Sequence, residues 1–220
     1  MTESSGASEW SGSSLGEGPL ADVFAPRPVL SQTLRFTGRV WDVVTDEVDL
    51  GAGGVVHRDY LRHSGAVAIM ALNELGEVYL VHQYRHPVGR VLWEPPAGLL
   101  DIQDEPPLEA AKRELWEEAD LRAATWHTLA DFFTTPGGVS ERIRIFLARD
   151  LTEVPEAERF AREAEELEME GRWVALPRLL EAILAGRVGG PTTSLGAFAL
   201  DAAIRSGFAT LRPADAPFSQ

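Results

Sequence analysis

Residues 96–121 read PAGLLDIQDEPPLEAAKRELWEEADL, and this stretch predicts a helix from Pro106 to about Leu121. Asp104 or Glu105 can cap the N-terminus of that helix, and prolines suit its first turn, where a missing N–H costs little. Apolar residues recur along it at helical spacing, at Leu108, Ala111, Leu115 and Ala119. The stretch therefore predicts an amphipathic helix that buries one face.

Three glutamates crowd the neighbouring face of this predicted helix. Glu118 lies four residues after Glu114, and Glu117 lies three after it, so their carboxylates share one side. Like charges at this spacing destabilise an isolated helix by roughly 0.2–0.5 kcal/mol per pair. Arg113 can pair with Glu117, and a magnesium ion would relieve more of the repulsion, because it prefers carboxylate oxygens. Taken alone, the cluster fits either a solvated acidic face or a cation site.

Extended segments flank the helix on both sides. Ala66 to Leu72 is a continuous apolar run typical of a buried strand, and Val78 to His82 is its partner across a turn. Alternating apolar residues between Gln32 and Arg62, interrupted by the turn-forming Gly51-Ala52-Gly53-Gly54, predict a small antiparallel sheet with a hairpin. Downstream we expect strands at Thr125 to Phe133, Ile143 to Ala148 and Gly171 to Val174, helices at Pro177 to Leu184 and Ser194 to Ile204, and an irregular tail from Pro213.

Composition narrows the class of protein. The 220 residues carry a formal net charge of −14, which disfavours binding to the phosphate backbone of nucleic acids. The chain has no cysteine, so disulfides and thiolate metal sites are excluded. It has no apolar stretch of about 18 residues to span a membrane, and its first twenty residues do not resemble a secretory signal. We therefore expect a cytoplasmic enzyme with no nucleic-acid or membrane partner.

The residues quoted above resemble the Nudix box. That motif has a glycine, then an acidic residue, then Arg-Glu-apolar-any-Glu-Glu on a helix, matched here by Gly98, Glu105 and residues 113–118. One departure is an extra residue between Gly98 and Glu105, unless Asp104 takes the acidic role. The other is Asp120, which replaces a glycine that ends the helix in a left-handed conformation; Asp tolerates that conformation better than most residues. Neither departure removes a carboxylate.

The flanking residues resemble one subgroup of that family, the ADP-ribose pyrophosphatases. Residues 82–98 (HQYRHPVGRVLWEPPAG) are similar to the subgroup's approach to the box, and residues 135–142 (TPGGVSER) are similar to a loop after the helix. Pro136 lies sixteen residues after Asp120, close to the subgroup's proline marker. The resemblance covers about residues 34–204.

The resemblance implies a cation site and a catalytic cluster on the helix. It implies that magnesium, with manganese as the alternative, is held by two side chains and one backbone carbonyl: Glu114, Glu118 and Ala97. Arg113 and Glu117 complete the cluster on the helix. A second acidic run, from Glu163 to Glu170, fits a solvated loop when taken alone, but the resemblance implies that it supplies the general base, Glu165 or Glu166.

The resemblance also implies a set of substrate-binding residues: Arg85, Glu94, Trp41, Gly98, Pro136, Gly137, Glu141 and Arg142. Arg85 can bind a phosphate bidentately, although an ordinary surface arginine is the alternative. Glu94 fits either a polar contact to the substrate or a simple pair with an arginine. Trp41 fits either a place in the core or, as in this subgroup, an aromatic ring that stacks on the adenine from the partner subunit.

The fold class that the resemblance implies is α/β: an α/β/α sandwich around a mixed sheet, preceded by a small antiparallel sheet. We expect three parts, a disordered N-terminal extension (residues 1–30), a small β-sheet dimerisation domain (31–64) and a Nudix hydrolase domain (65–210). Because the small sheet exchanges between subunits in this subgroup, we expect a homodimer whose sites contain both chains.

The resemblance implies hydrolysis of ADP-ribose to AMP and ribose 5-phosphate. Three alternatives remain open at this point. The first is that the substrate is another nucleoside-diphosphate sugar. The second is that the protein is a regulator that binds nucleotides without catalysis, and the third is that both acidic clusters are purely structural. The complete carboxylate set argues against the second alternative, and the third predicts that neither activity nor stability depends on a metal.

Overall fold

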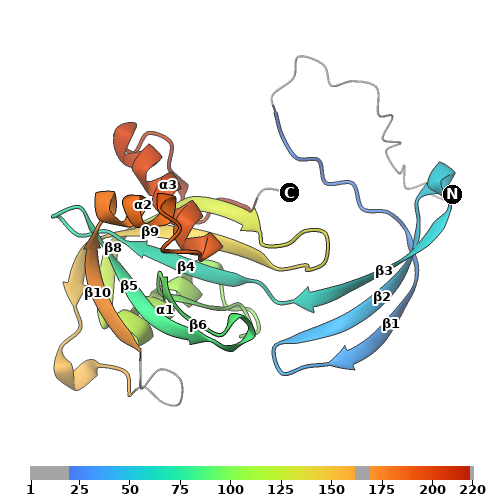
Figure 1. Ribbon diagram of the computed structural model, residues 1–220, viewed down its shortest axis with the longest axis horizontal. Helices are drawn as coiled ribbons and strands as arrows, with labels where there is room; N and C mark the ends of the chain where they lie inside the picture. Colours follow the sequence, from blue (N-terminus) through green and yellow to red (C-terminus); the bar gives the residue numbers. More distant parts are fainter. Residues whose placement is uncertain (1–19, 162–168, 219–220) are drawn as a thin grey trace, which may run out of the picture.

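The structure is a computed structural model and describes residues 20–161 and 169–218. Residues 20–28 form no helix or strand, and they lead into a three-stranded antiparallel sheet: β1 (Val29–Thr37), β2 (Trp41–Asp49) and β3 (Val55–His63). Gly51–Gly53 forms the short 3-10 turn between β2 and β3, so the predicted hairpin is confirmed. This sheet projects away from the rest of the fold (Figure 1). The disorder expected for the N-terminal extension falls largely on residues 1–19, which lie outside the described residues.

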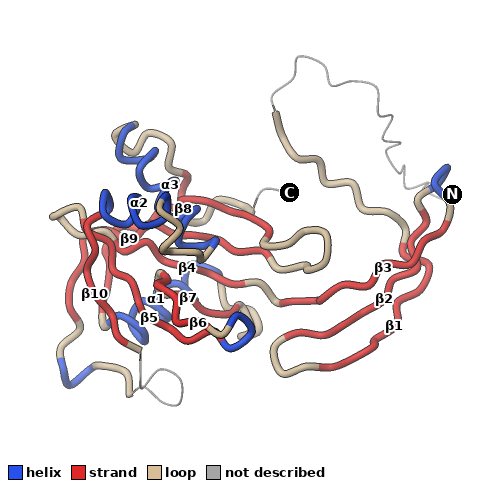
Figure 2. The backbone as a smooth tube through the Cα atoms, viewed as in Figure 1, coloured by secondary structure: helices blue, strands red, loops and turns tan. Residues whose placement is uncertain are grey.

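Two further sheets form the main body (Figure 2). A five-stranded mixed sheet has the order β11-β8-β9-β4-β7, in which only β4 and β9 run parallel: β11 (Arg212–Pro213), β8 (Leu121–Phe133), β9 (Arg142–Glu153), β4 (Ala66–Ala71) and β7 (Ala97–Leu99). An antiparallel sheet has the order β10-β5-β6: β10 (Glu170–Ala175), β5 (Glu77–Arg85) and β6 (Arg90–Glu94). The strands expected from the apolar runs are confirmed, with ends that shift by a few residues.

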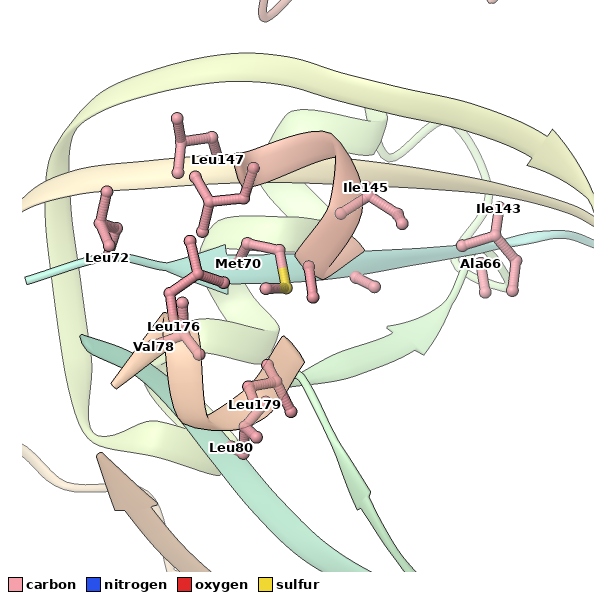
Figure 3. Packing of buried hydrophobic residues seen from close by; sticks show 13 residues of the cluster. Ala66, Met70, Leu72, Val78, Leu80, Ile143, Ile145, Leu147, Leu176 and Leu179 are labelled. Carbon is pink, nitrogen blue, oxygen red and sulfur yellow. The ribbon is translucent and has the colours of Figure 1, made fainter. Parts of the chain in front are cut away.

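Helices cover both sides of the body, which confirms the α/β/α class. The helix α1 (Pro107–Ala119) packs on one side, while α2 (Leu176–Leu184) and α3 (Pro191–Arg205) pack on the other. Figure 3 shows the cluster on the second side, where Leu176 and Leu179 of α2 lie beside Val78 and Leu80 of β5. None of the helices in the described ranges is long and apolar enough to cross a membrane.

The strand β4 explains why its apolar run is continuous. All six of its residues are buried, because alternate side chains enter opposite clusters. Ala66, Ala68 and Met70 belong to the cluster under α2 and α3. Val67, Ile69 and Ala71 belong to the cluster under α1.

The N-terminal cap of α1 differs from expectation, whereas the conformation at its C-terminal end agrees with it. The helix begins at Pro107, and Pro106 occupies the cap position with no side-chain hydrogen bond, so neither Asp104 nor Glu105 caps it. Consecutive prolines set the start instead, because each fixes φ near the helical value. At the other end Asp120 adopts φ 52°, the left-handed conformation expected of the residue that replaces glycine. The helix therefore ends at Ala119, and β8 begins directly at Leu121.

The C-terminal tail is more ordered than expected from Pro213 onward. Arg212 and Pro213 pair with β8, and the Thr128 hydroxyl donates to the Pro213 carbonyl at 2.9 Å. Arg144, buried in an ion pair with Asp131, donates to the Ala216 carbonyl at 2.6 Å. These contacts join residues that lie far apart in the sequence, so local patterns could not predict them.

Candidate active site

The junction of β7 and α1 brings the box residues together. Gly98 of β7 lies against Glu114 of α1 so closely that a β-carbon on residue 98 would stand 1.8 Å from Glu114 Oε1. The backbone N–H of Ala97 donates to Glu118 Oε2 at 2.9 Å. Both glutamates are buried, each 8% exposed. The glycine is therefore required because a carboxylate occupies the space of its missing side chain.

Arg113 organises the carboxylates around this junction. Its guanidinium donates to both oxygens of Glu105 at 3.1 and 3.0 Å, to Glu114 at 2.6 Å and to Glu117 at 3.1 Å. The hydrogen bonds to Glu105 are the largest cause of a raised pKa for Arg113, and its partial burial acts in the opposite direction. Arg113 thus stays charged and holds three carboxylates in place.

Of the two acidic candidates before the helix, Glu105 contacts the box arginine and Asp104 is exposed. Glu105 is half-buried and takes the bidentate pair with Arg113. Asp104 is exposed and adopts φ 63° in a turn, and this turn accommodates the extra residue of the loop. Asp is among the few non-glycine residues that adopt this conformation at modest cost.

The oxygens at this junction suit a hard divalent cation. Glu114 and Glu118 supply two buried carboxylates on consecutive turns beside the Ala97 backbone. Within residues 20–161 and 169–218, no group of three or more His, Asp or Glu side chains converges to hold a metal. Magnesium commonly takes one or two carboxylates and completes its shell with water and substrate phosphates, so two carboxylates and a carbonyl are a sufficient protein contribution.

Arg85 and Glu94 form a second group on the neighbouring sheet. The Arg85 Nε and Nη2 atoms both donate to Glu94 Oε2, at 2.9 and 2.6 Å. Strand alternation places Glu94, paired with Val81, on the opposite sheet face from Trp93. The arginine pair considered for Glu94 is therefore present, and 43% of the Arg85 side chain is exposed.

The loop before β9 forms a third group and contacts the small sheet. The Leu61 N–H donates to the Gly138 carbonyl, and the Ser140 N–H returns a bond to the Leu61 carbonyl, each at 2.9 Å. Glu141 lies 3.6 Å from His63, and the Arg142 guanidinium lies 5.2 Å from the Phe218 ring centroid. Pro136 and Gly137 are exposed at the tip of this loop.

Trp41 begins β2 and is 41% exposed, which contradicts a place in the core. Its ring lies 6.4 Å from that of Phe36, measured between centroids. The proposed bases Glu165 and Glu166 lie outside the described residues.

One contact beside the box was missed from the sequence. Trp116, at the unrestricted position of the motif, donates its indole N–H to the Glu158 carbonyl at 3.0 Å. Its ring also meets Phe160 edge-on at 5.5 Å. The segment that precedes residues 162–168 is thus attached to the helix that carries Glu114 and Glu118. A tryptophan on an otherwise polar helix face was the available signal.

Comparison with known proteins agrees with this geometry. The family model of the NUDIX domain matches residues 61–189. The chain is 41% identical to an ADP-ribose pyrophosphatase of Mycobacterium tuberculosis over 189 residues, 85% of this chain and 88% of the relative. It is 37% identical to an ADP-ribose pyrophosphatase of Bacillus subtilis over 55% of this chain and 65% of the relative.

A solved structure described as an ADP compounds hydrolase superposes on the fold with a TM-score of 0.66. The match covers 85% of this chain and 98% of that one at 19% identity, and it therefore supports the fold alone. The family model spans more than half of the chain, and its range includes every residue of the carboxylate junction. The chain belongs to the Nudix family.

Proposed function

We propose that this protein hydrolyses the diphosphate of ADP-ribose to AMP and ribose 5-phosphate. The observation that carries the proposal is the β7–α1 junction, where Gly98 makes room for Glu114 and Ala97 binds Glu118. The names of the two relatives above support the choice of substrate, since both exceed 30% identity with this chain.

Nudix hydrolases generally depend on a divalent metal, and the chemistry of the junction favours magnesium, with manganese as the alternative. Glu114, Glu118 and the Ala97 carbonyl would hold it. When bound, such a cation neutralises charge on the diphosphate oxygens and lowers the pKa of coordinated water.

The chain's own residues then bind and orient the substrate. Arg113, anchored by Glu105, keeps Glu114 and Glu117 in fixed orientations, which limits the rearrangement that the site needs when substrate arrives. Arg85 would bind a phosphate oxygen, and Glu94 would accept a hydrogen bond from the substrate. Gly98 leaves room for the Glu114 carboxylate, and its backbone would lie beside the diphosphate.

The general base belongs to the second acidic run. Glu165 or Glu166 would take the proton of the attacking water, since a carboxylate within hydrogen-bond reach is the usual group for that step. The loop residues Pro136, Gly137, Glu141 and Arg142 would contact the terminal ribose or its phosphate.

A homodimer is part of the proposal. Large apolar side chains are exposed on the small sheet and its approaches, each more than 40% exposed: Val29, Leu30, Leu34, Phe36, Val40, Trp41 and Val55. Many large apolar side chains exposed on one small sheet are typical of a surface that a partner covers. In such a dimer Trp41 would stack on the adenine held by the partner subunit.

The test is AMP release from ADP-ribose with magnesium, with and without chelator, beside a panel of nucleoside-diphosphate sugars. Glu118→Gln should lower kcat at least 100-fold, whereas Glu109→Gln should not change it, because Glu109 lies on the same helix and pairs with exposed Lys112. A melting temperature within a few degrees of wild type shows that both variants fold. Activity that survives the chelator, or equal activity of both variants, would overturn the proposal; preferential turnover of a different compound would keep the hydrolysis and replace the substrate.

A further inference from the structure

A cavity of about 370 Å³ lies between β10, α2 and the turn that follows α2. Its volume falls in the usual range for small-molecule sites, roughly 300–1,000 Å³. Trp93 and Arg172 form part of its lining. Because Trp93 and Glu94 are consecutive in β6, their side chains point to opposite faces of the sheet. The cavity is therefore on the far side of the sheet from the Arg85–Glu94 pair.

The lining is rich in arginine although the chain as a whole is acidic, with 20 basic against 34 acidic residues. Arg172, Arg178 and Arg187 all border the cavity. Arg187 pairs with Glu181 at 3.0 Å. Within the described part of the chain, neither Arg172 nor Arg178 forms an ion pair. Two guanidinium groups thus border one cavity without an ion-pair partner among the described residues.

Two carboxylates, Glu77 and Glu181, also border the cavity, and each has a partner of its own. Glu181 is the partner of Arg187, and Glu77 accepts a hydrogen bond from the Asn73 side chain at 3.0 Å. Neither lies in an ion pair with Arg172 or Arg178, and the lining carries three arginines against two glutamates, a net positive charge.

Stacking holds Arg172 in a defined orientation. Its guanidinium carbon lies 4.1 Å from the centroid of the Trp93 ring, and Trp93 in turn stacks on His82 at 4.2 Å with an interplanar angle of 10°. The Thr193 hydroxyl donates to the Trp93 carbonyl at 2.9 Å and fixes the strand beneath the stack. A guanidinium that lies flat on a ring keeps its N–H groups at its edge, where they can meet an oxyanion.

We propose that this cavity binds a small phosphate-bearing ligand, with the phosphate held between Arg172 and Arg178. Planar guanidinium forks match the oxygens of phosphate, and bidentate pairs of this kind are stronger than neutral hydrogen bonds. Binding here needs neither the box carboxylates nor a divalent cation, so it stands apart from the hydrolysis proposed above.

Calorimetric titration of the full chain tests the site, with inorganic phosphate and ribose 5-phosphate as separate probes. The buffer contains chelator, so that no cation can bring phosphate to the box. If ribose 5-phosphate binds saturably and inorganic phosphate does not, the ligand is a phosphate monoester. If both probes bind equally, inorganic phosphate is enough to occupy the site. Both results support the site, and the indole resonance of Trp93 should shift during the titration.

Two variants locate the binding. Arg172→Gln and Arg178→Gln should each weaken it at least tenfold, and Arg178 lies on the exposed side of α2, where substitution leaves the core intact. Arg205→Gln is the matched control, since Arg205 is also an exposed helical arginine, 76% exposed and paired with Asp201. The proposal is overturned if neither probe binds saturably, or if Arg178→Gln binds as tightly as Arg205→Gln.

Discussion

A β-carbon on residue 98 would lie 1.8 Å from Glu114 Oε1, and therefore Gly98 and the first box glutamate occupy one space between them. Two atoms cannot approach this closely, so any side chain at position 98 displaces the carboxylate. The glycine of the motif and the glutamate of the helix are two halves of one steric arrangement.

Gly98→Ala should lower kcat for AMP release about 100-fold, because small misplacements of a catalytic group cost about that much. Gly189→Ala is the control, since a β-carbon there meets nothing within 4 Å and its φ is not positive. Steady-state kinetics of both variants, with thermal melts to verify folding, check the prediction. Full activity in Gly98→Ala would contradict the steric account.

Glu105→Gln should lower the free energy of unfolding by about 1–3 kcal/mol, because it weakens a charge-assisted, bidentate pair with Arg113. Asp104→Asn should change it by less than about 0.5 kcal/mol, as expected of an exposed residue. Urea unfolding of the two variants makes the comparison. A larger effect of the Asp104 substitution would return the acidic role to that residue.

Asp120→Ala should destabilise the protein by about 1–2 kcal/mol, since alanine has no favourable way to adopt φ 52°. Asp120→Gly should be neutral or stabilising, because glycine adopts that conformation freely. Thermal melts of the two variants measure the difference, and a glycine variant less stable than the alanine variant would show that the backbone conformation is not what selects this residue.

Trp41→Ala should raise KM for ADP-ribose about tenfold or more and leave kcat within a factor of two, because loss of a stacking ring weakens binding without touching the reacting atoms. Val40→Ala, the exposed neighbour, is the control. Initial rates over a range of ADP-ribose concentrations separate the two constants. A fall in kcat with unchanged KM would assign Trp41 a different role.

Mixing the inactive Glu118→Gln chain with the Trp41→Ala chain should restore substrate affinity in part of the population. If each site combines Glu118 of one chain with Trp41 of its partner, the mixed dimer holds one site in which both residues are native. Sedimentation shows whether dimers form, and kinetics at low ADP-ribose detect the restored site. A mixture no better than the average of its components would mean that each site belongs to one chain.

The amino-acid sequence predicted those parts of the fold that depend on local periodicity. A strand buried on both faces, such as β4, leaves a continuous apolar run in the sequence. A helix buried on one face, such as α1, leaves apolar residues at helical spacing, so both elements could be identified. The predicted helix start was correct to within one residue, but the predicted cap was wrong, since Pro106 occupies the cap position instead of Asp104 or Glu105. Pairing of Arg212 with Thr128 and the exposure of Trp41 depend on tertiary packing, which no local pattern records.

The candidate site was also predicted in part from the sequence. Residue types and spacing placed Gly98, Glu114 and Glu118 together, because the motif restricts all three at once. A pair of Glu94 with an arginine was one of two alternatives, and strand register shows that this arginine is Arg85, while the contact of Glu94 with a substrate stays a prediction. The anchor of Trp116 on Glu158 is a contact of a side chain with a backbone carbonyl, and any residue type can provide that acceptor.

The alternation of β4 between two clusters has a consequence for how the molecule unfolds. Its side chains are shared by the layer under α1 and the layer under α2 and α3, so neither layer can open widely without exposing apolar surface of the other. A shift of this strand by one residue would exchange both sets of side chains at once. The helix that holds the carboxylates and the helices on the far side should therefore acquire protection from hydrogen exchange as one cooperative unit.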